Sequence, residues 1–420
     1  MAFLEKYKLL DTLGEGGFAK VYKVRHVTLG YVRAVRVLNS VIAQGETDKT
    51  YQRFLEECRL LLRLGNGCHP NIVHIYQPIL VSQLATVEMD FVDGKTLKDY
   101  LEEKSKFVPI GDVVKLVMEI GSALAYCHED IYRYCMDREE DELEDDPLDG
   151  SKVLVDEDKK QELINKYRVI HNDIHSGNIM RKENGSYMLL DFGLAIEGED
   201  VVRSSRRKNG APEFKAPEKW DDDSELSTES DVYSFGVVLY EYLTGRVPFV
   251  FDKGNSNSIE AEYLLGKAHK NQAPPSIFEQ RKAAYESTFP GETYKKDYPD
   301  WLETLVLKCL EKKACNRFRN GRELYDFVMG NYNCNNKSNA DEFLQQIEMQ
   351  HQMISELSAS REQLEAQLQK ADADIKVLEG RVKMLGAEKN KLATENEGLK
   401  KEHDRLMDIL PDVWVVPKSE

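Results

Sequence analysis

Strand-like and helix-like patterns occupy separate parts of this chain, and their order constrains the fold more than any other feature. Residues 8–38 alternate short β-branched and aromatic runs with glycines, which predicts three antiparallel strands joined by tight turns. Helical spacing follows at 51–64, and two more strand-like runs lie at 72–80 and 84–92. From there to about residue 330 the pattern is mainly helical. This order predicts an α+β chain with two lobes rather than a parallel βαβ sheet.

Beyond the helical part, leucine dominates every seventh position, which predicts a long α-helical coiled coil. The leucine seam consists of Leu357, Leu364, Ala371, Leu378, Leu385, Leu392, Leu399 and Leu406. In the facing seam, Ile375 and Val382 favour two parallel strands, and Asn396 can fix their register. We therefore expect a parallel homodimer through residues 341–410. The alternative is an amphipathic helix that folds back on the globular part.

Acidic residues crowd one stretch of the helical part, which we interpret as an insert at residues 129–168. It contains the run DREEDELEDDPLDG, whose like charges favour an extended, solvated segment. Tyr132, Tyr134 and Cys135 could fix its start to the body. The insert could recruit a basic partner, although most charge runs are only solvated loops. The expected divisions are a first lobe at 1–92, a second lobe at 93–330, a linker at 331–340, the coiled coil at 341–410 and a tail at 411–420.

Charge and composition argue against several classes of partner. Lys and Arg number 57 against 74 Asp and Glu, a formal charge of −17, so we expect neither nucleic acid nor an anionic membrane as partner. The N-terminal MAFLEKYKLL is interrupted by charges, and no uncharged apolar run approaches the ~18 residues of a membrane helix. The seven cysteines are odd in number and never spaced C-x-x-C, so we expect them reduced and mostly structural. These features predict a cytoplasmic protein.

The most specific chemistry lies in the segments VIHNDIHSGNIM and MLLDFGLA. Both follow apolar, strand-like residues, so their polar side chains would meet in one cleft. Asn178 and Asp191 are hard oxygen ligands suited to Mg²⁺, and Asp173 is then placed to accept a proton from an attacking hydroxyl. Any one of these could instead be a turn-forming residue, but their combined spacing argues against that interpretation.

A glycine-rich turn lies between the first two expected strands, in LGEGGFAKVY. Gly14, Gly16 and Gly17 would let the backbone approach a phosphate closely and offer it amide groups. A hairpin turn also needs glycine, so the turn alone leaves both interpretations open.

With these motifs the sequence resembles the eukaryotic-type protein kinase family over about residues 7–330. Ala216-Pro217-Glu218 matches the family's APE motif, Asp231 matches the aspartate that braces the catalytic loop, and Arg317 matches the partner of Glu218. The resemblance implies a bilobal kinase fold that uses ATP and Mg²⁺. The catalytic positions it implies are Asp173, His175, Arg36 and Glu57, and the metal ligands are Asn178 and Asp191. The nucleotide-binding positions it implies are Gly14, Gly16, Gly17, Val21, Ala34, Arg36, Met89, Asp90 and Val92.

Several residues depart from the family's pattern. Arg36 replaces the phosphate-anchoring lysine; it is longer and fork-shaped, but it could still pair with Glu57 and touch phosphate oxygens. Asn172 replaces the arginine that meets a phosphate on the activation segment, so we do not expect activation by that route. His175 replaces a lysine and could donate to the γ-phosphate or simply pack. Ala211 stands where Ser/Thr kinases usually have threonine.

The sequence therefore predicts a protein kinase that transfers the γ-phosphate of ATP to a protein hydroxyl, with Ser/Thr favoured, and that dimerises through its coiled coil. One alternative is a pseudokinase scaffold, which the arginine at position 36 motivates. A second is a small-molecule phosphotransferase, because HNDIHSGN also resembles the loop of antibiotic kinases. The sequence does not name the protein substrate or the pathway.

Overall fold

In the computed structural model the chain forms two compact units, residues 1–337 and 338–420. The first contains both predicted lobes, and the second contains the predicted coiled coil. The structure describes residues 6–15, 19–41, 49–64, 69–81, 84–103, 107–133, 135, 157–192, 195–197, 211–221, 226–250, 258–335, 378 and 380–405.

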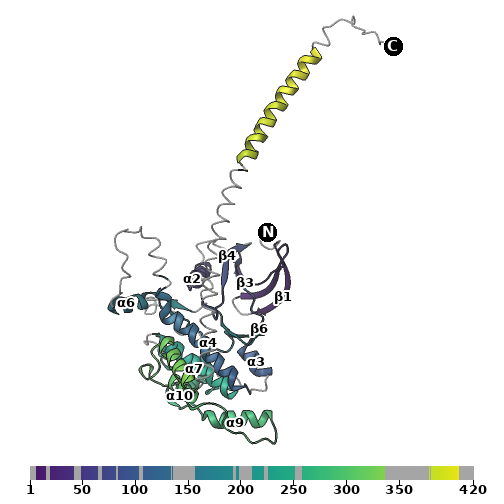
Figure 1. Cartoon of the computed structure of the whole chain (residues 1–420). Coiled ribbons are helices and arrows are strands. Elements are labelled where there is room, and N and C mark those ends of the chain that lie inside the picture. The colour runs from purple at the N-terminus through teal and green to yellow at the C-terminus, as the bar shows by residue number, and fades with distance from the viewer. Residues whose placement is uncertain are drawn as a thin grey trace. The chain divides into compact units, whose positions relative to one another are not determined.

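The first lobe is an antiparallel sheet of five strands in the order β1-β2-β3-β5-β4, joined by one helix, α2 (Figure 1). Its elements are β1 (Tyr7–Glu15), β2 (Ala19–His26), β3 (Val32–Val41), α2 (Lys49–Arg63), β4 (Ile75–Val81) and β5 (Leu84–Asp90). The predicted strands and helix are thus confirmed, with ends that differ by a few residues. On the predicted apolar face of α2, Phe54, Cys58 and Leu61 are buried, whereas Leu62 is only partly buried.

The second lobe is mainly helical and is organised around α7 (Thr228–Thr244), which is buried almost throughout its length. A Ser227–Ser230 capping box begins this helix, and Gly245 ends it at φ 79°, a left-handed conformation that favours glycine. Helices α4 (Ile110–Ala125), α9 (Ile277–Thr288), α10 (Asp300–Cys309) and α11 (Gly321–Asn335) pack against it. The predicted bilobal α+β fold is therefore confirmed.

The second lobe contains further helices and several short strands. The helices are α3 (Leu97–Glu103), the π-helix η2 (Tyr126–Asp130), α6 (Glu157–Tyr167), η5 (Pro212–Phe214), η6 (Pro217–Trp220), α8 (Ser258–Asn271) and η7 (Ala314–Asn316). The strands are β6 (Gly94–Thr96), β7 (Val169–Ile170), β8 (Ile179–Lys182), β9 (Tyr187–Leu189) and β10 (Ile196–Glu197). Strands β6, β8 and β9 form one small sheet, and β7 pairs with β10 in another.

Both flanks of the predicted insert are helical. On one side the chain remains helical through η2 to Arg133, and Tyr132 and Cys135 are buried, as expected of residues that fix the start of the insert. On the other side α6 occupies the last part of the predicted insert at 129–168. Tyr134 and the acidic run at 137–150 lie outside the described residues.

The cysteines that the structure describes with side chains are free. Cys58, Cys127, Cys135 and Cys309 are buried, and Cys315 is exposed. This agrees with the expectation of reduced, mostly structural cysteines. In the described parts of the chain, no helix combines the length and the apolar character that crossing a membrane requires.

Within the second unit, residues 380–405 are helical and exposed along their whole length. The seam positions Leu385, Leu392 and Leu399 are 64%, 58% and 64% exposed in the single chain. Residues 341–377, 379 and 406–410 of the predicted coiled coil lie outside the described residues. The tail at 411–420 also lies outside them.

Candidate active site

The strand register of the first lobe gathers the predicted nucleotide-binding side chains on one face of the sheet. Val21 of β2 lies opposite Arg36 of β3, and Ala34 of β3 lies opposite Met89 of β5. Opposed residues of an antiparallel pair share a face, and so do residues two apart in a strand. The side chains of Val21, Ala34, Arg36 and Met89 therefore lie on one face. Gly14 pairs with Val21, so the first glycine of the loop borders the same region.

Arg36 connects this sheet face to a helix and to the second lobe. Its guanidinium forms an ion pair with Glu57 of α2, whose side chain is 9% exposed, and Nη1 lies 3.8 Å from Oδ1 of Asp191. Burial by itself would lower the pKa of Arg36, but the charges of Glu57 and Asp191 outweigh it and raise that pKa. The structure thus brings together three residues that the sequence proposed for one site.

Asp231 of α7 anchors the segment that leads to Asp173. Its Oδ2 accepts a hydrogen bond from the His171 backbone N–H at 2.6 Å, and its Oδ1 accepts one from the Asn172 N–H at 2.8 Å. His128 Nε2 lies 3.1 Å from Oδ2. Because His128 Nδ1 accepts the Gly321 N–H, its Nε2 carries the proton and donates to Asp231. Burial alone would raise the pKa of Asp231, but these contacts lower it.

Asp173, the predicted base, is held in place by two hydrogen-bond donors. Asn178 Nδ2 donates to its Oδ2 at 3.2 Å, and the Ala211 backbone N–H donates to its Oδ1 at 3.3 Å. Burial alone would raise the pKa of Asp173, but contact with His175 outweighs it and lowers the pKa. The carboxylate is therefore ionised at neutral pH and can accept a proton.

His175 presents one ring nitrogen to this carboxylate. Its Nδ1 accepts a hydrogen bond from the Gly177 N–H at 3.0 Å, and its Nε2 lies 3.7 Å from Oδ2 of Asp173. The backbone contact therefore assigns the proton to Nε2 in the neutral ring. The ring also lies 5.9 Å from that of Phe214, which gives the packing role a structural basis, whereas donation to a γ-phosphate stays a prediction.

Asn178 and Asp191 are suited to bind a magnesium ion together with phosphate oxygens. The amide nitrogen of Asn178 is directed to Asp173, which leaves its side-chain oxygen as the atom it could offer a metal. Asp191 is exposed and has φ 53°, a left-handed conformation. Nowhere in the described residues do three or more His, Cys, Asp or Glu side chains form a metal-binding group. Mg²⁺ commonly uses one or two carboxylates and completes its shell with phosphates and water.

The APE glutamate pairs with the arginine that the resemblance assigned to it. Arg317 Nη1 and Nη2 each donate to one oxygen of Glu218 at 2.8 Å, and Ser230 Oγ donates to Oε1 at 2.7 Å. Arg317 is almost fully buried. This bidentate pair ties the APE motif to the segment that follows η7.

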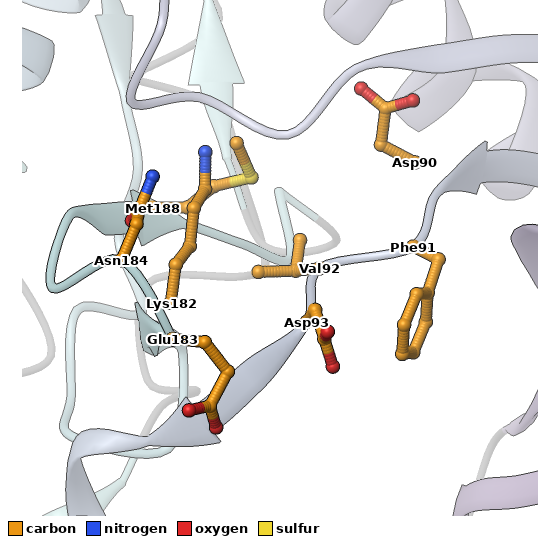
Figure 2. Close-up of a pocket in the computed structure, with 8 residues that line it drawn as sticks. All are labelled: Asp90, Phe91, Val92, Asp93, Lys182, Glu183, Asn184 and Met188. Atoms are coloured by element: carbon orange, nitrogen blue, oxygen red, sulfur yellow. The ribbon is translucent and has the colours of Figure 1, made fainter.

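A cleft of about 330 Å³ lies beside the segment that connects the two lobes. Figure 2 shows its lining: Asp90, Phe91, Val92, Asp93, Lys182, Glu183, Asn184 and Met188. Neither Asp173 nor Asp191 lines it, so this hollow is not where phosphate transfer would occur. The ammonium of Lys23 lies 3.9 Å from the Phe91 ring centre, at the connecting segment.

Two buried residues of this region were missed from the sequence. His128 comes from the segment AYCHE, and Lys219 directly follows the APE motif, with its Nζ donating to the Asn172 carbonyl at 2.7 Å. The available signals in the sequence were the polar His128 inside an otherwise apolar helix and Lys219 beside a recognised motif. Gly16 and Gly17, which we also predicted for the site, lie outside the described residues.

Comparison with known proteins gives a family match over most of the chain. A model of the protein kinase domain matches residues 7–135 and 162–365. The interval between the two matched parts coincides with the middle of the predicted insert. The matched range includes the described residues of the candidate site, from Gly14 to Arg317.

Curated relatives match the same part of the chain. A probable serine/threonine-protein kinase of Clostridium acetobutylicum is 26% identical over 76% of this chain and 39% of its own length. Serine/threonine-protein kinase PknB of Mycobacterium leprae is 27% identical over 76% and 42%. Serine/threonine-protein kinase PrkC of Bacillus subtilis is 24% identical over 76% and 39%. The matched region thus spans about two fifths of the length of these relatives.

Proposed function

The chain belongs to the protein kinase family, and from that premise we propose that it transfers the γ-phosphate of ATP to a protein hydroxyl, with serine or threonine as the preferred acceptor. The observation that carries this proposal is the position of Asp173, whose carboxylate receives hydrogen bonds from Asn178 and from the Ala211 backbone. Its loop is held by Asp231. The names of the relatives support Ser/Thr as the acceptor class.

In this proposal each polar group has a separate task. Asp173 accepts the proton of the acceptor hydroxyl as that oxygen attacks phosphorus. Arg36, held between Glu57 and Asp191, faces the phosphate oxygens with a fixed positive charge. Asn178 and Asp191 would hold Mg²⁺, which neutralises charge on the phosphates when bound. The sheet face with Val21, Ala34 and Met89, together with Asp90 and Val92, would hold the adenine.

We also propose a parallel homodimer through residues 341–410. The exposure of Leu385, Leu392 and Leu399 in the described helix supports it, because a second copy would bury this apolar stripe. A cytoplasmic location stays a prediction from the sequence.

Arg36 favours one competing function, a pseudokinase scaffold. Arginine and lysine are not interchangeable at a fitted site, so the larger guanidinium could crowd the nucleotide. The retention of Asp173 beside Asn178, and of Glu57 and Asp191 beside Arg36, favours catalysis, since a scaffold needs none of these residues.

The deciding experiment is phosphate incorporation from labelled ATP by the purified full-length protein with Mg²⁺, beside Asp191→Asn and Arg36→Lys. Incorporation that disappears in Asp191→Asn and after chelation of the metal would support the kinase. No incorporation in the parent, but incorporation in Arg36→Lys, would indicate a kinase fold that is inactive because of the arginine at position 36. No incorporation in any of the three would favour the scaffold.

A further inference from the structure

Lys219 is a buried lysine in contact with the catalytic loop. It lies in η6, its side chain belongs to a residue only 4% exposed, and its Nζ donates a hydrogen bond to the backbone carbonyl of Asn172 at 2.7 Å. Lysine is almost never fully buried unless its charge is compensated. The burial of this ammonium therefore indicates that it has a structural or functional role.

The peptide groups that flank Asn172 are held from both sides. The Asn172 N–H donates to Asp231, and the Asn172 carbonyl accepts from Lys219. Between these contacts the residue has φ 65°, and Asn172 and Asp191 are the two non-glycine residues of the described chain with positive φ. Such conformations persist only where the surroundings hold them. The next residue along the chain is Asp173, so this clamp fixes the backbone that carries the proposed base.

Lys219 is also the cation that the altered loop would otherwise lack. Asn172, His175 and Ala211 stand where the resembled family has arginine, lysine and threonine, so three polar or charged groups around Asp173 are replaced. Burial lowers the pKa of Lys219 to about 8, although Asp231 and Asp173 act in the opposite direction. Glu218 also favours the charged form, and Lys215 opposes it. The lysine thus carries a positive charge at neutral pH, near the buried carboxylate of Asp231 and the partly buried carboxylate of Asp173.

We propose that Lys219 is a positioning residue that replaces, from within the fold, the arginine missing at position 172. Its ammonium holds the Asn172 carbonyl and so orients Asp173, without a phosphate on the activation segment. The inference rests on the proposed kinase function and adds a form of regulation to it. Turnover should not depend on phosphorylation of Ser204 and Ser205, the two hydroxyl residues between Asp191 and Glu218, which lie outside the described residues.

The test compares Lys219→Met, Lys219→Gln and Lys219→Arg in the full-length protein, with Lys312→Met as the matched control. Lys312 is also a partly buried lysine whose pKa burial lowers to about 8, but its ammonium lies 4.7 Å from the Phe249 ring centre and contacts no residue of the catalytic loop. Methionine removes both charge and donor, glutamine keeps a donor, and arginine keeps both. We expect kcat to fall by about 100-fold in Lys219→Met, with KM for ATP little changed, because a misplaced catalytic group costs about that much.

The ranking of the variants and the pH profile separate positioning from mere packing. The kcat value should decrease in the order arginine, glutamine, methionine at position 219, and stay at the parent value in Lys312→Met. The parent should lose kcat as pH rises through about 8, and this loss should be absent in Lys219→Met. Lys215→Met removes the opposing charge, so the loss should then move to higher pH.

Hydrogen exchange gives a readout that does not depend on turnover. Amides in residues 169–178 should exchange faster in Lys219→Met than in the parent or in Lys312→Met, at an unfolding temperature that is not lower than that of the parent. Equal kcat in Lys219→Met and the parent, or loss of activity after phosphatase treatment of the parent, would overturn the inference. An inactive parent would refute the kinase function, and unchanged exchange would then refute the clamp separately.

Discussion

The guanidinium Nη1 of Arg36 lies 3.8 Å from Oδ1 of Asp191, and the same guanidinium is paired with Glu57. One side chain thus links strand β3, helix α2 and the proposed metal ligand of the second lobe. The fork shape of arginine allows two carboxylates to be contacted at once, which a single ammonium does less readily. This arrangement explains how an arginine can occupy the place of a lysine without leaving Glu57 uncompensated.

Replacing Arg36 by methionine should abolish phosphate transfer and also lower stability. Glu57 is buried, and removing the partner of a buried charge costs about 3–5 kcal/mol. Arg36→Lys should retain most of the stability, because it keeps a positive charge near both carboxylates. Denaturant unfolding and labelled-ATP turnover measure the two effects.

Arg25→Met is the control for Arg36. Arg25 lies in the neighbouring strand β2, and its side chain is exposed. This variant should lose little activity. Turnover in Arg36→Met at the rate of the parent would contradict the role of Arg36 in the site.

Asp173→Asn should lower kcat by a factor of about 10²–10⁴, the usual contribution of a general base. Nucleotide binding should change little, because no predicted nucleotide contact involves this side chain. Equilibrium binding of ATP with Mg²⁺ and steady-state turnover distinguish these outcomes. Asp221→Asn, which changes an exposed carboxylate paired with Lys270, is the control and should leave both unchanged. A fall in ATP affinity that accounts for the whole rate loss would argue against a base.

The elements of the site could be predicted from the sequence because each depends on local pattern. The alternation of residues 8–38 predicted the strands, and their register then placed Val21, Ala34 and Arg36 on one face. The spacing from Asp173 to Asn178 and on to Asp191 predicted the cluster of polar groups. Such patterns indicate which residues belong to an element and which face they share.

Contacts across distant parts of the chain could not be predicted in this way. Lys219 reaches the Asn172 carbonyl across 47 positions, and His128 reaches Asp231 across 103. Nothing local to either residue determines that contact. The contact of Lys23 could not be predicted either. Strand alternation indicates the face on which Lys23 lies, but not that its ammonium lies over the Phe91 ring. Tertiary packing decides where long side chains end.

Arg317→Met should destabilise the second lobe by about 3–5 kcal/mol at neutral pH, because it leaves the Glu218 carboxylate without its bidentate partner. Burial would raise the pKa of Glu218, but Arg317 lowers it below its usual value. A lowered folded-state pKa gives stability that is present above the unfolded value and lost as pH falls through the folded value. The difference between parent and variant should therefore shrink below about pH 4.

Chemical unfolding at several pH values measures this difference. Arg319→Met provides the control, because Arg319 is 83% exposed and pairs with Glu323 on the surface. Exposed pairs contribute about 0–1 kcal/mol. An equal loss in both variants would show that the burial of the Arg317–Glu218 pair has no energetic consequence.

Leu392→Arg should dissociate the proposed dimer, because it places a charge in the leucine seam of the coiled coil. Thr394→Arg, on the outer face of the same heptad, should leave the dimer intact. Sedimentation gives the mass of each form. Since a tether raises the mutual concentration of two kinase units to about millimolar, the monomeric variant should autophosphorylate more slowly, at a rate that depends on protein concentration. Equal masses and equal rates in the two variants would show that the seam does not join two copies, and that the tail serves another purpose.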